Sequence, residues 1–251
     1  MRPAYFDRYP TIHFERDAQG ILLMRLHSND GPVVYSSQHH SDWCGAFHDV
    51  GCDRGNKVVI LTGTGDEFIT QFGWDKQLST AEDWDETYWE GKNMLRNLLN
   101  IEVPIIGVVN GPATIHAELA VLSDITLAAT HATFQDMPHT TFGVVPGDGV
   151  HIVWQDLLGS NRGRYFLLTG QTLSAEEAFN LGVINEILPP DQLLPRAYAV
   201  AHKLAALPVL TLRYSRVALT QRLRRLLEEN LGYGLALEGL AALGLVQSQK
   251  K

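Results

Sequence analysis

The stretch IIGVVNGPATIHAELAVLSDITLAA, residues 105–129, decides the fold class. It opens with an apolar run, 105–109, that stops at the turn formers Asn110-Gly111-Pro112, and it closes with a second apolar run, 125–129. Residues 116–122, between the two runs, have the spacing of a short helix. Two continuously apolar strands joined through a helix are typical of parallel pairing with helices packed on the sheet. The stretch therefore predicts an α/β protein.

The residues before this stretch extend the same pattern. Residues 58–62, Val-Val-Ile-Leu-Thr, read as another fully buried strand. Helical spacing runs from Ser36 to Val50, with Ser36 or Ser37 as a plausible N-cap, and again from Trp84 to Leu99. Strands and helices that alternate along the chain strengthen the prediction of a parallel sheet.

The two ends of the chain differ from the centre. Residues 12–14 and 21–26 alternate apolar and polar side chains around a turn, which predicts a β-hairpin. From Val150 onward helical periods dominate, and Ser174-Ala175-Glu176-Glu177 has the form of a capping box. We expect a core over residues 1–190 and a C-terminal helical region over residues 191–251.

Composition excludes several classes of protein. The net charge of −8 argues against nucleic-acid binding, which needs a basic surface. Two cysteines, Cys44 and Cys52, provide no disulfide framework. Residues 1–10 have no apolar signal core, and no apolar run approaches the roughly 18 residues of a membrane span. We expect a cytoplasmic protein without membrane contact.

Signatures of bound cofactors and metals are missing from the sequence. No P-loop is present, and Gly63-Thr64-Gly65 lacks the third glycine of a dinucleotide fingerprint. None of the ten histidines stands in a His-Glu-x-x-His pattern. The neighbours His39 and His40 would point apart on a helix. The sequence therefore predicts neither a cofactor nor a metal.

Chemistry is concentrated in the turn-rich segment 135–149, which contains His139 and Asp148. A histidine held by a carboxylate is the usual arrangement of a general base, because the carboxylate fixes the tautomer and stabilises the imidazolium. On spacing alone a second interpretation stays open, in which Asp148 caps a helix near Val150 and His139 lies on a surface loop.

Motifs over residues 10–210 resemble those of the crotonase (enoyl-CoA hydratase) superfamily. They are Asn110-Gly111-Pro112-Ala113, Glu118-Leu119, Ser123-Asp124-Ile125, residues 142–147 and residues 170–184. The resemblance implies a spiral of stacked ββα turns. It also implies that the C-terminal helical region mediates homo-trimers or dimers of trimers.

The departures from the superfamily pattern bear on function. Thr114-Ile115-His116-Ala117 replaces the glycine run whose backbone N–H polarises a thioester carbonyl. His139 stands where hydratases have a catalytic glutamate, and Asp148 where they have alanine. These substitutions, with residues 158–171, resemble the branch of 6-oxocamphor hydrolase and related β-diketone hydrolases. That branch cleaves a (bi)cyclic β-diketone by retro-Claisen addition of water, which gives a keto acid.

The resemblance implies roles for single residues. His139 and Asp148 match the dyad that activates water, and His116 matches a histidine that acts as acid or charge stabiliser. Tyr35 stands where 6-oxocamphor hydrolase has a tryptophan that binds a substrate carbonyl; a packing role is the alternative. His40 and Glu238 match further polar positions, and His40 is either structural or catalytic.

Trp74, Trp84, Trp89 and Phe142 are expected to line an apolar cavity for a small diketone, although aromatic residues are more common in plain cores. Two other functions stay open. One is a CoA-thioester hydratase, isomerase or hydrolase, and the other is a non-catalytic crotonase-fold protein used for binding or assembly.

Overall fold

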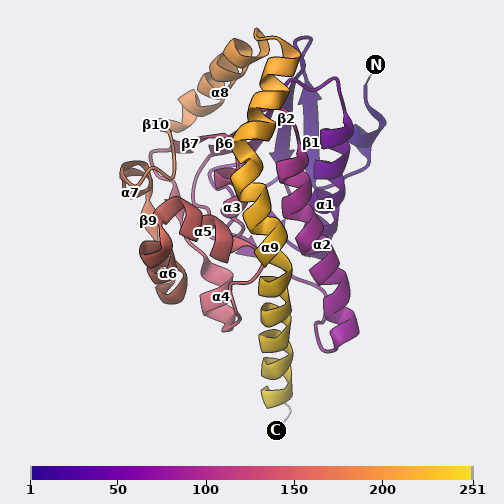
Figure 1. The fold of residues 1–251 in the computed structure, drawn as a ribbon, viewed down its shortest axis with the longest axis vertical. Helices are drawn as coiled ribbons and strands as arrows, with labels where there is room; N and C mark the ends of the chain where they lie inside the picture. The colour runs from indigo at the N-terminus through magenta and orange to yellow at the C-terminus, as the bar shows by residue number, and fades with distance from the viewer. Residues whose placement is uncertain (1, 250–251) are drawn as a thin grey trace.

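The computed structural model describes residues 2–249, which form a sheet covered by helices (Figure 1). Six strands follow the order β1-β2-β4-β6-β7-β10 across this sheet. β1 and β2 pair antiparallel and the other neighbours pair parallel, as the α/β prediction required. The bounds are β1 Ile12–Arg16, β2 Ile21–Leu26, β4 Val58–Thr62, β6 Ile105–Val109, β7 Ile125–Ala129 and β10 Glu186–Leu188.

Four two-residue strands form a second layer. They are β3 Val34–Tyr35, β5 Gln71–Phe72, β8 Thr133–Phe134 and β9 Leu173–Ser174. β3 pairs with β5 and β8 with β9, and isolated bridges join Ile69 to Ala113 and Ala113 to Phe134. A long strand, a short extended segment and a helix thus repeat along the chain, as the implied ββα spiral requires. Sequence periodicity missed these strands because two residues are too few to show alternation.

The helices follow the predicted pattern with small shifts at their ends. α2 begins three residues before the expected Trp84 because Thr80 caps it: the Thr80 hydroxyl accepts from the Asp83 N–H, and the Asp83 carboxylate accepts from the Thr80 N–H. The bounds are α1 Ser37–Cys52, α2 Ala81–Asn100, α3 Glu118–Val121, α4 Met137–Phe142, α5 Val150–Leu158, α6 Ser160–Thr169, α7 Ala175–Asn180, α8 Pro190–Ala205 and α9 Val209–Gln249, with a 3-10 turn at Ala4–Asp7.

The core lies on both faces of the central strands. All five residues of β4 and all five of β6 are buried. α8 packs on β2, β4, β6 and β7, while α1 packs along α2 and α2 along α9. Each fully buried Val, Leu or Ile side chain stabilises the fold by about 1.5–3 kcal/mol, so these strands form a rigid support for the loops at their ends.

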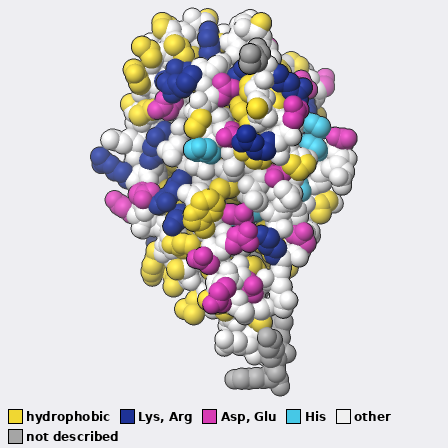
Figure 2. Space-filling view, turned by 90° about the vertical axis from the view of Figure 1, so that its right-hand side faces the viewer, with side chains coloured by type: hydrophobic (Ala, Val, Ile, Leu, Met, Phe, Trp, Pro, Cys, Tyr) yellow, Lys and Arg dark blue, Asp and Glu magenta, His cyan; other side chains and the backbone are white. Residues whose placement is uncertain are grey.

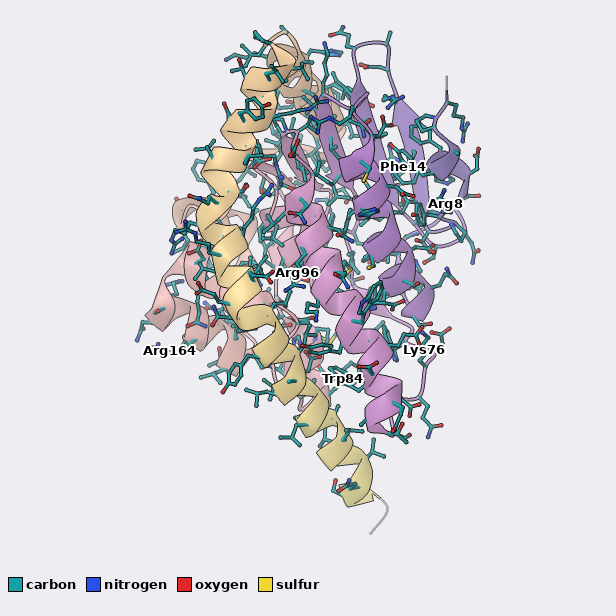
Figure 3. All side chains as sticks on the ribbon, turned by 45° about the vertical axis from the view of Figure 1, so that its right-hand side comes forward. Arg8, Phe14, Lys76, Trp84, Arg96 and Arg164 are labelled. Carbon is teal, nitrogen blue, oxygen red and sulfur yellow. The ribbon has the colours of Figure 1, made fainter. Side chains whose placement is uncertain are left out.

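The long helix α9 is anchored near its N-terminal end by Arg216, whose side chain is buried. The Arg216 guanidinium pairs with Asp124 at 2.6 Å and donates to the Leu99 carbonyl at 2.9 Å. It thereby satisfies a carbonyl at the C-terminus of α2, where the helix dipole favours a cation. Further along, Arg96 of α2, labelled in Figure 3, faces α9. It pairs with Glu228 of α9 at 2.7 Å. These contacts fix the first half of α9, and the second half continues from it along the cavity.

One property of α9 departs from the sequence analysis. Among residues 2–249, it is the one helix long and apolar enough, by length and composition, to cross a membrane. Core helices pass the same test, and here Leu227, Leu231 and Leu235 pack into the core.

Lys and Arg side chains on the face in Figure 2 lie in separate groups among acidic and apolar ones. The division at residue 190, assembly through the C-terminal region and cytoplasmic location stay predictions.

Candidate active site

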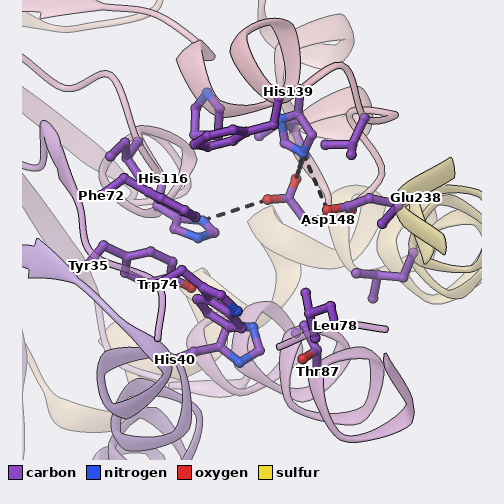
Figure 4. A pocket seen from close by; sticks show the side chains of 18 of the residues that line it. Tyr35, His40, Phe72, Trp74, Leu78, Thr87, His116, His139, Asp148 and Glu238 are labelled. Atoms are coloured by element: carbon purple, nitrogen blue, oxygen red, sulfur yellow. Dashed lines mark hydrogen bonds and ion pairs between the residues drawn. The ribbon is translucent and has the colours of Figure 1, made fainter. Parts of the chain in front are cut away.

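A cavity of about 260 Å³ lies between α2, α4, α9 and the short strands β3 and β5 (Figure 4). Segments far apart in the sequence contribute its walls. The predicted residues that line it are Tyr35, His40, Trp74, Trp84, His116, His139, Phe142, Asp148 and Glu238. The expectation for Trp89 is wrong, because its side chain is 59 % exposed and lies outside the cavity. The fold therefore brings the other predicted residues together.

His139 lies on the short helix α4 and is buried. Its Nδ1 hydrogen-bonds Asp136 Oδ1 at 2.6 Å, one helical turn earlier. The expectation that Asp148 holds the imidazole is therefore wrong for this hydrogen bond, because Asp136 occupies that nitrogen. An ionised carboxylate only accepts hydrogen bonds, so Nδ1 carries the proton and Nε2 faces the cavity.

Two further carboxylates approach the free side of the His139 ring. Asp148 Oδ1 lies 3.7 Å and Glu238 Oε1 3.6 Å from Nε2. Asp148 is held in a loop whose next residue, Gly149, adopts φ 115°, a conformation that favours glycine. Glu238 reaches the same place from the second half of α9. The three acidic residues surround one imidazole inside a largely apolar cavity.

The electrostatics of this cluster follow from burial and close charges. Burial lowers the pKa of His139, but Asp148, Asp136 and Glu238 outweigh it and raise the pKa to about 12. Burial raises the pKa of Asp148, but His139 and His116 outweigh it and lower that pKa below its ordinary value. Burial raises the pKa of Glu238 to about 7. The cluster thus holds an imidazolium, a persistent carboxylate and a carboxyl group that exchanges its proton near neutral pH.

His116 lies near Asp148 Oδ2, the carboxylate oxygen that does not approach His139. Its Nδ1 hydrogen-bonds Glu118 at 2.6 Å and lies 3.9 Å from Asp148 Oδ2. Burial lowers the pKa of His116, but Glu118 outweighs it and raises the pKa above the ordinary value. His116 has φ 47°, which is uncommon for a residue with a side chain and directs the ring toward the cavity. A cationic imidazole here can stabilise or protonate an anionic intermediate.

Tyr35 packs against His116, with ring centroids 4.4 Å apart. Burial raises the pKa of its phenol well above the ordinary value, so Tyr35 stays a neutral hydrogen-bond donor. Beside it, His40 Nδ1 hydrogen-bonds the buried Glu90 at 2.8 Å. This hydrogen bond fixes the orientation of the buried His40 ring.

The predicted cavity aromatics differ in exposure. Trp84 donates its indole N–H to the Leu235 carbonyl of α9 at 3.1 Å, so it joins α2 to α9 at the cavity edge. Phe142 is 46 % exposed and contacts Phe72 with ring centroids 4.9 Å apart. Phe142 and Phe72 form part of the cavity rim.

Two of the four N–H groups in residues 114–117, which replace the glycine run of the superfamily, are occupied by backbone hydrogen bonds. The N–H groups of Thr114 and Ile115 both donate to the Ile69 carbonyl, at 2.9 and 3.2 Å. These two groups are not free to polarise a substrate carbonyl.

Sequence reasoning missed the partners of the three histidines: Asp136, Glu118 and Glu90. Asp136 and His139 stand three positions apart, a spacing that places side chains on one helix face, and this signal was available. Glu118 follows His116 by two positions, which gives no such signal. Glu90 lies 50 positions from His40, and only the fold brings them together.

Two groups of cavity side chains also have the spacing of a metal site. Ligand atoms of His139, Asp148 and Glu238 lie within 4.8 Å of one another, as do those of His116, Glu118 and Asp148. Nitrogen and carboxylate ligands of this kind suit a divalent transition metal. Activity at this site is therefore to be compared with and without a metal chelator.

The chain is similar to several characterised proteins. It is 50 % identical to a β-diketone hydrolase from the cyanobacterium Anabaena sp. PCC 7120, solved bound to (S)-3-oxocyclohexyl acetic acid, with TM-score 0.95 over 97 % of this chain and 98 % of that one. An enoyl-CoA hydratase/isomerase from Mycobacterium paratuberculosis, 24 % identical, shares the fold with TM-score 0.84 over 95 % of this chain and 98 % of that one.

Among curated relatives, a crotonyl-CoA hydratase of Syntrophomonas wolfei is 31 % identical over 67 % of this chain and 66 % of its own length. A carnitinyl-CoA dehydratase of Salmonella arizonae is 33 % identical over 63 % of this chain and 61 % of its own length. The chain thus spans just under two thirds of these relatives. Residues 16–238 match the enoyl-CoA hydratase/isomerase family. The chain belongs to the enoyl-CoA hydratase/isomerase (crotonase) family.

Proposed function

We propose that the protein hydrolyses a carbon–carbon bond of a (bi)cyclic β-diketone by retro-Claisen addition of water, which gives a keto acid. The observation that carries the proposal is the cluster of His139, Asp148 and Glu238 at the wall of the cavity. A water molecule beside His139 Nε2 would meet a charged imidazole and two carboxylates at once.

The proton of the attacking water goes to this cluster. Because His139 is already protonated near neutral pH and Asp148 stays ionised, Glu238 is the member whose pKa of about 7 matches the task. The water oxygen bonds to one carbonyl carbon, which becomes a tetrahedral alkoxide beside the His139 imidazolium. The His139 imidazolium, held in place by Asp136, orients the water and stabilises this charge.

Cleavage follows from the alkoxide. Its electron pair re-forms a C=O bond, the bond to the central carbon breaks, and the departing pair enters the second carbonyl as an enolate. His116, whose raised pKa keeps it cationic, faces this charge and protonates the central carbon. The net reaction adds one water across one carbon–carbon bond and consumes no other reactant.

The nature of the cavity supports a small, uncharged substrate. Among the lining residues that the structure describes there is neither lysine nor arginine, so the walls offer no phosphate counter-ion. The similar Anabaena protein is a β-diketone hydrolase and binds a keto acid. Addition of water to a symmetric bicyclic 1,3-diketone yields an acid of that structure.

The test uses the symmetric bicyclic diketone whose hydrolysis gives 3-oxocyclohexyl acetic acid. Purified protein is incubated with EDTA and, separately, without it, in both cases without CoA, and substrate loss and product chirality are followed. We expect one enantiomer from the wild type, about 10²–10⁴-fold lower kcat/KM for His139→Ala, and wild-type kcat/KM for His48→Ala, an exposed histidine outside the cavity. No turnover of the diketone would overturn the proposal, and loss of turnover in EDTA alone would indicate a metal.

A second candidate is turnover of a CoA thioester, which the similarity to crotonyl-CoA hydratase favours. Consumption of crotonyl-CoA with the diketone left intact would establish it. Non-catalytic binding or assembly would leave both substrates untouched.

We further propose that α9 mediates homo-trimers or dimers of trimers, because it exposes Tyr233, Leu237 and Leu240. Light scattering measures the molar mass of the wild type and of Leu240→Glu. We expect trimers or hexamers of the wild type and smaller species of the variant, and a monomeric wild type would contradict the proposal.

A further inference from the structure

Three aromatic side chains form a wall of the cavity across from His139 (Figure 4). The ring centroids of Tyr35 and Trp74 lie 6.0 Å apart, those of His40 and Trp74 5.7 Å, and those of Tyr35 and His40 6.5 Å. His40 meets the indole edge-on at 80°, and Glu90 fixes the His40 ring through Nδ1. The orientation of the Trp74 indole is therefore set by its neighbours.

The indole N–H of Trp74 has no hydrogen-bond partner among the described residues, although it is buried. A buried donor without a partner is unfavourable, and most such groups in folded proteins are satisfied. Trp84, on another wall of the same cavity, shows the ordinary situation: its N–H donates to the Leu235 carbonyl. An indole is a donor only, so what Trp74 lacks is an acceptor.

We propose that Trp74 Nε1–H donates a hydrogen bond to the ketone oxygen of the substrate that water does not attack, and so selects substrates with a second carbonyl. The inference rests on the proposed function and names a specificity-determining residue for it. Tyr35 and His40 hold the indole, while the attacked carbonyl lies toward His139 and Glu238.

The bond gains strength during the reaction. When the carbon–carbon bond breaks, its electron pair moves through the central carbon to the second oxygen, which becomes an enolate. Hydrogen bonds to a charged acceptor are stronger than those to a neutral one, so Trp74 stabilises the enolate more than the ketone. No proton leaves the indole, and carbon is protonated elsewhere.

The experiment compares two ligands and three proteins. Isothermal titration measures 3-oxocyclohexyl acetic acid and cyclohexyl acetic acid, which differ in one ketone, on wild type, Trp74→Phe and Trp89→Phe. Phenylalanine keeps an aromatic ring and removes the N–H, and Trp89 is an exposed tryptophan outside the cavity. In the wild type we expect the keto acid to bind about 5–10-fold tighter, as one net hydrogen bond provides.

In Trp74→Phe this preference disappears, and in Trp89→Phe it remains. The Trp74 indole N–H signal, assigned from its loss in Trp74→Phe, moves downfield in ¹H–¹⁵N spectra with the keto acid only. We also expect kcat/KM for the diketone to fall about 10²-fold in Trp74→Phe.

Failure of this inference and failure of the proposed function give different results. Equal affinity of the wild type for the two acids, no binding of either acid, or a ketone preference that survives Trp74→Phe overturns the inference even if the diketone is hydrolysed. A preference lost in Trp74→Phe, with no diketone turnover by the wild type, supports ketone recognition by Trp74 and overturns the hydrolase.

Discussion

Glu238→Gln changes one charge in the cluster and keeps the shape of the side chain. Glu238 is largely buried, and its pKa rises from 4.5 to about 7. A carboxyl group with a raised pKa in the folded state contributes stability below its unfolded pKa and loses it as pH rises through the folded pKa. For Glu238 this window runs from pH 4.5 to about 7.

The magnitude follows from the shift. One pKa unit corresponds to about 1.36 kcal/mol, so ionising Glu238 in the folded protein costs on the order of 3 kcal/mol at pH 8. Glutamine cannot ionise and avoids this cost. We therefore expect Glu238→Gln to be more stable than the wild type at pH 8 by up to that amount, and close to the wild type at pH 4.5. The variant should lose about 10²–10⁴-fold in kcat/KM, because its proton acceptor is gone.

Urea unfolding at pH 4.5, 6 and 8 measures the stability difference, and a pH profile of kcat/KM on the diketone measures the catalytic one. The wild-type profile should rise through about pH 7 as Glu238 loses its proton, and this limb should vanish in Glu238→Gln. A variant destabilised equally at all three values, or one that keeps the limb, would refute the assignment of Glu238 as proton acceptor. A limb near pH 6.5 that survives in Glu238→Gln would return that role to His139.

Three further substitutions, with Gly244→Ala as a control, test other contacts. Asp136→Asn removes the carboxylate that holds His139, and kcat/KM should fall at least about 10²-fold on the diketone; an unchanged value would show that this hydrogen bond does not matter. In Gly234→Ala the new Cβ would overlap the backbone of the loop that carries Asp148, so activity should drop, whereas Gly244→Ala meets open space and should stay active. Arg216→Met leaves buried polar groups unpaired and should lower the free energy of unfolding by about 3–5 kcal/mol; a loss below 1 kcal/mol in urea titration would contradict its anchoring role.

Local sequence was enough for the long strands and most of the helices. The apolar runs 58–62, 105–109 and 125–129 all form the strands that were predicted, because a strand buried on both faces has few compatible sequences. The same holds for the capping box at Ser174, where the serine hydroxyl accepts from the Glu177 N–H as expected. Such features depend on residues a few positions apart.

For the candidate site, the sequence indicated the residues but not all of their contacts. Family motifs pointed to His116, His139, Asp148 and Glu238, and the fold brings all of them to one cavity. Asp148 lies 3.7 Å from His139 Nε2, as a pairing of the two residues requires, but the hydrogen bond at Nδ1 comes from Asp136, which the sequence analysis did not name. Spacing shows which side chains can meet, but it does not show which of several carboxylates reaches a given nitrogen.

The charge states were decided by the tertiary structure alone. In sequence, Glu238 is an acidic residue 90 positions or more from Asp148 and His139, and nothing local distinguishes it from an exposed glutamate. Its pKa of about 7 exists because α9, anchored by Arg216, carries it into an apolar cavity beside other carboxylates. The sequence thus determined which chemical groups are present, whereas burial and distances of a few ångströms decided their protonation, since desolvation and Coulomb energies depend on position in space and not on position along the chain.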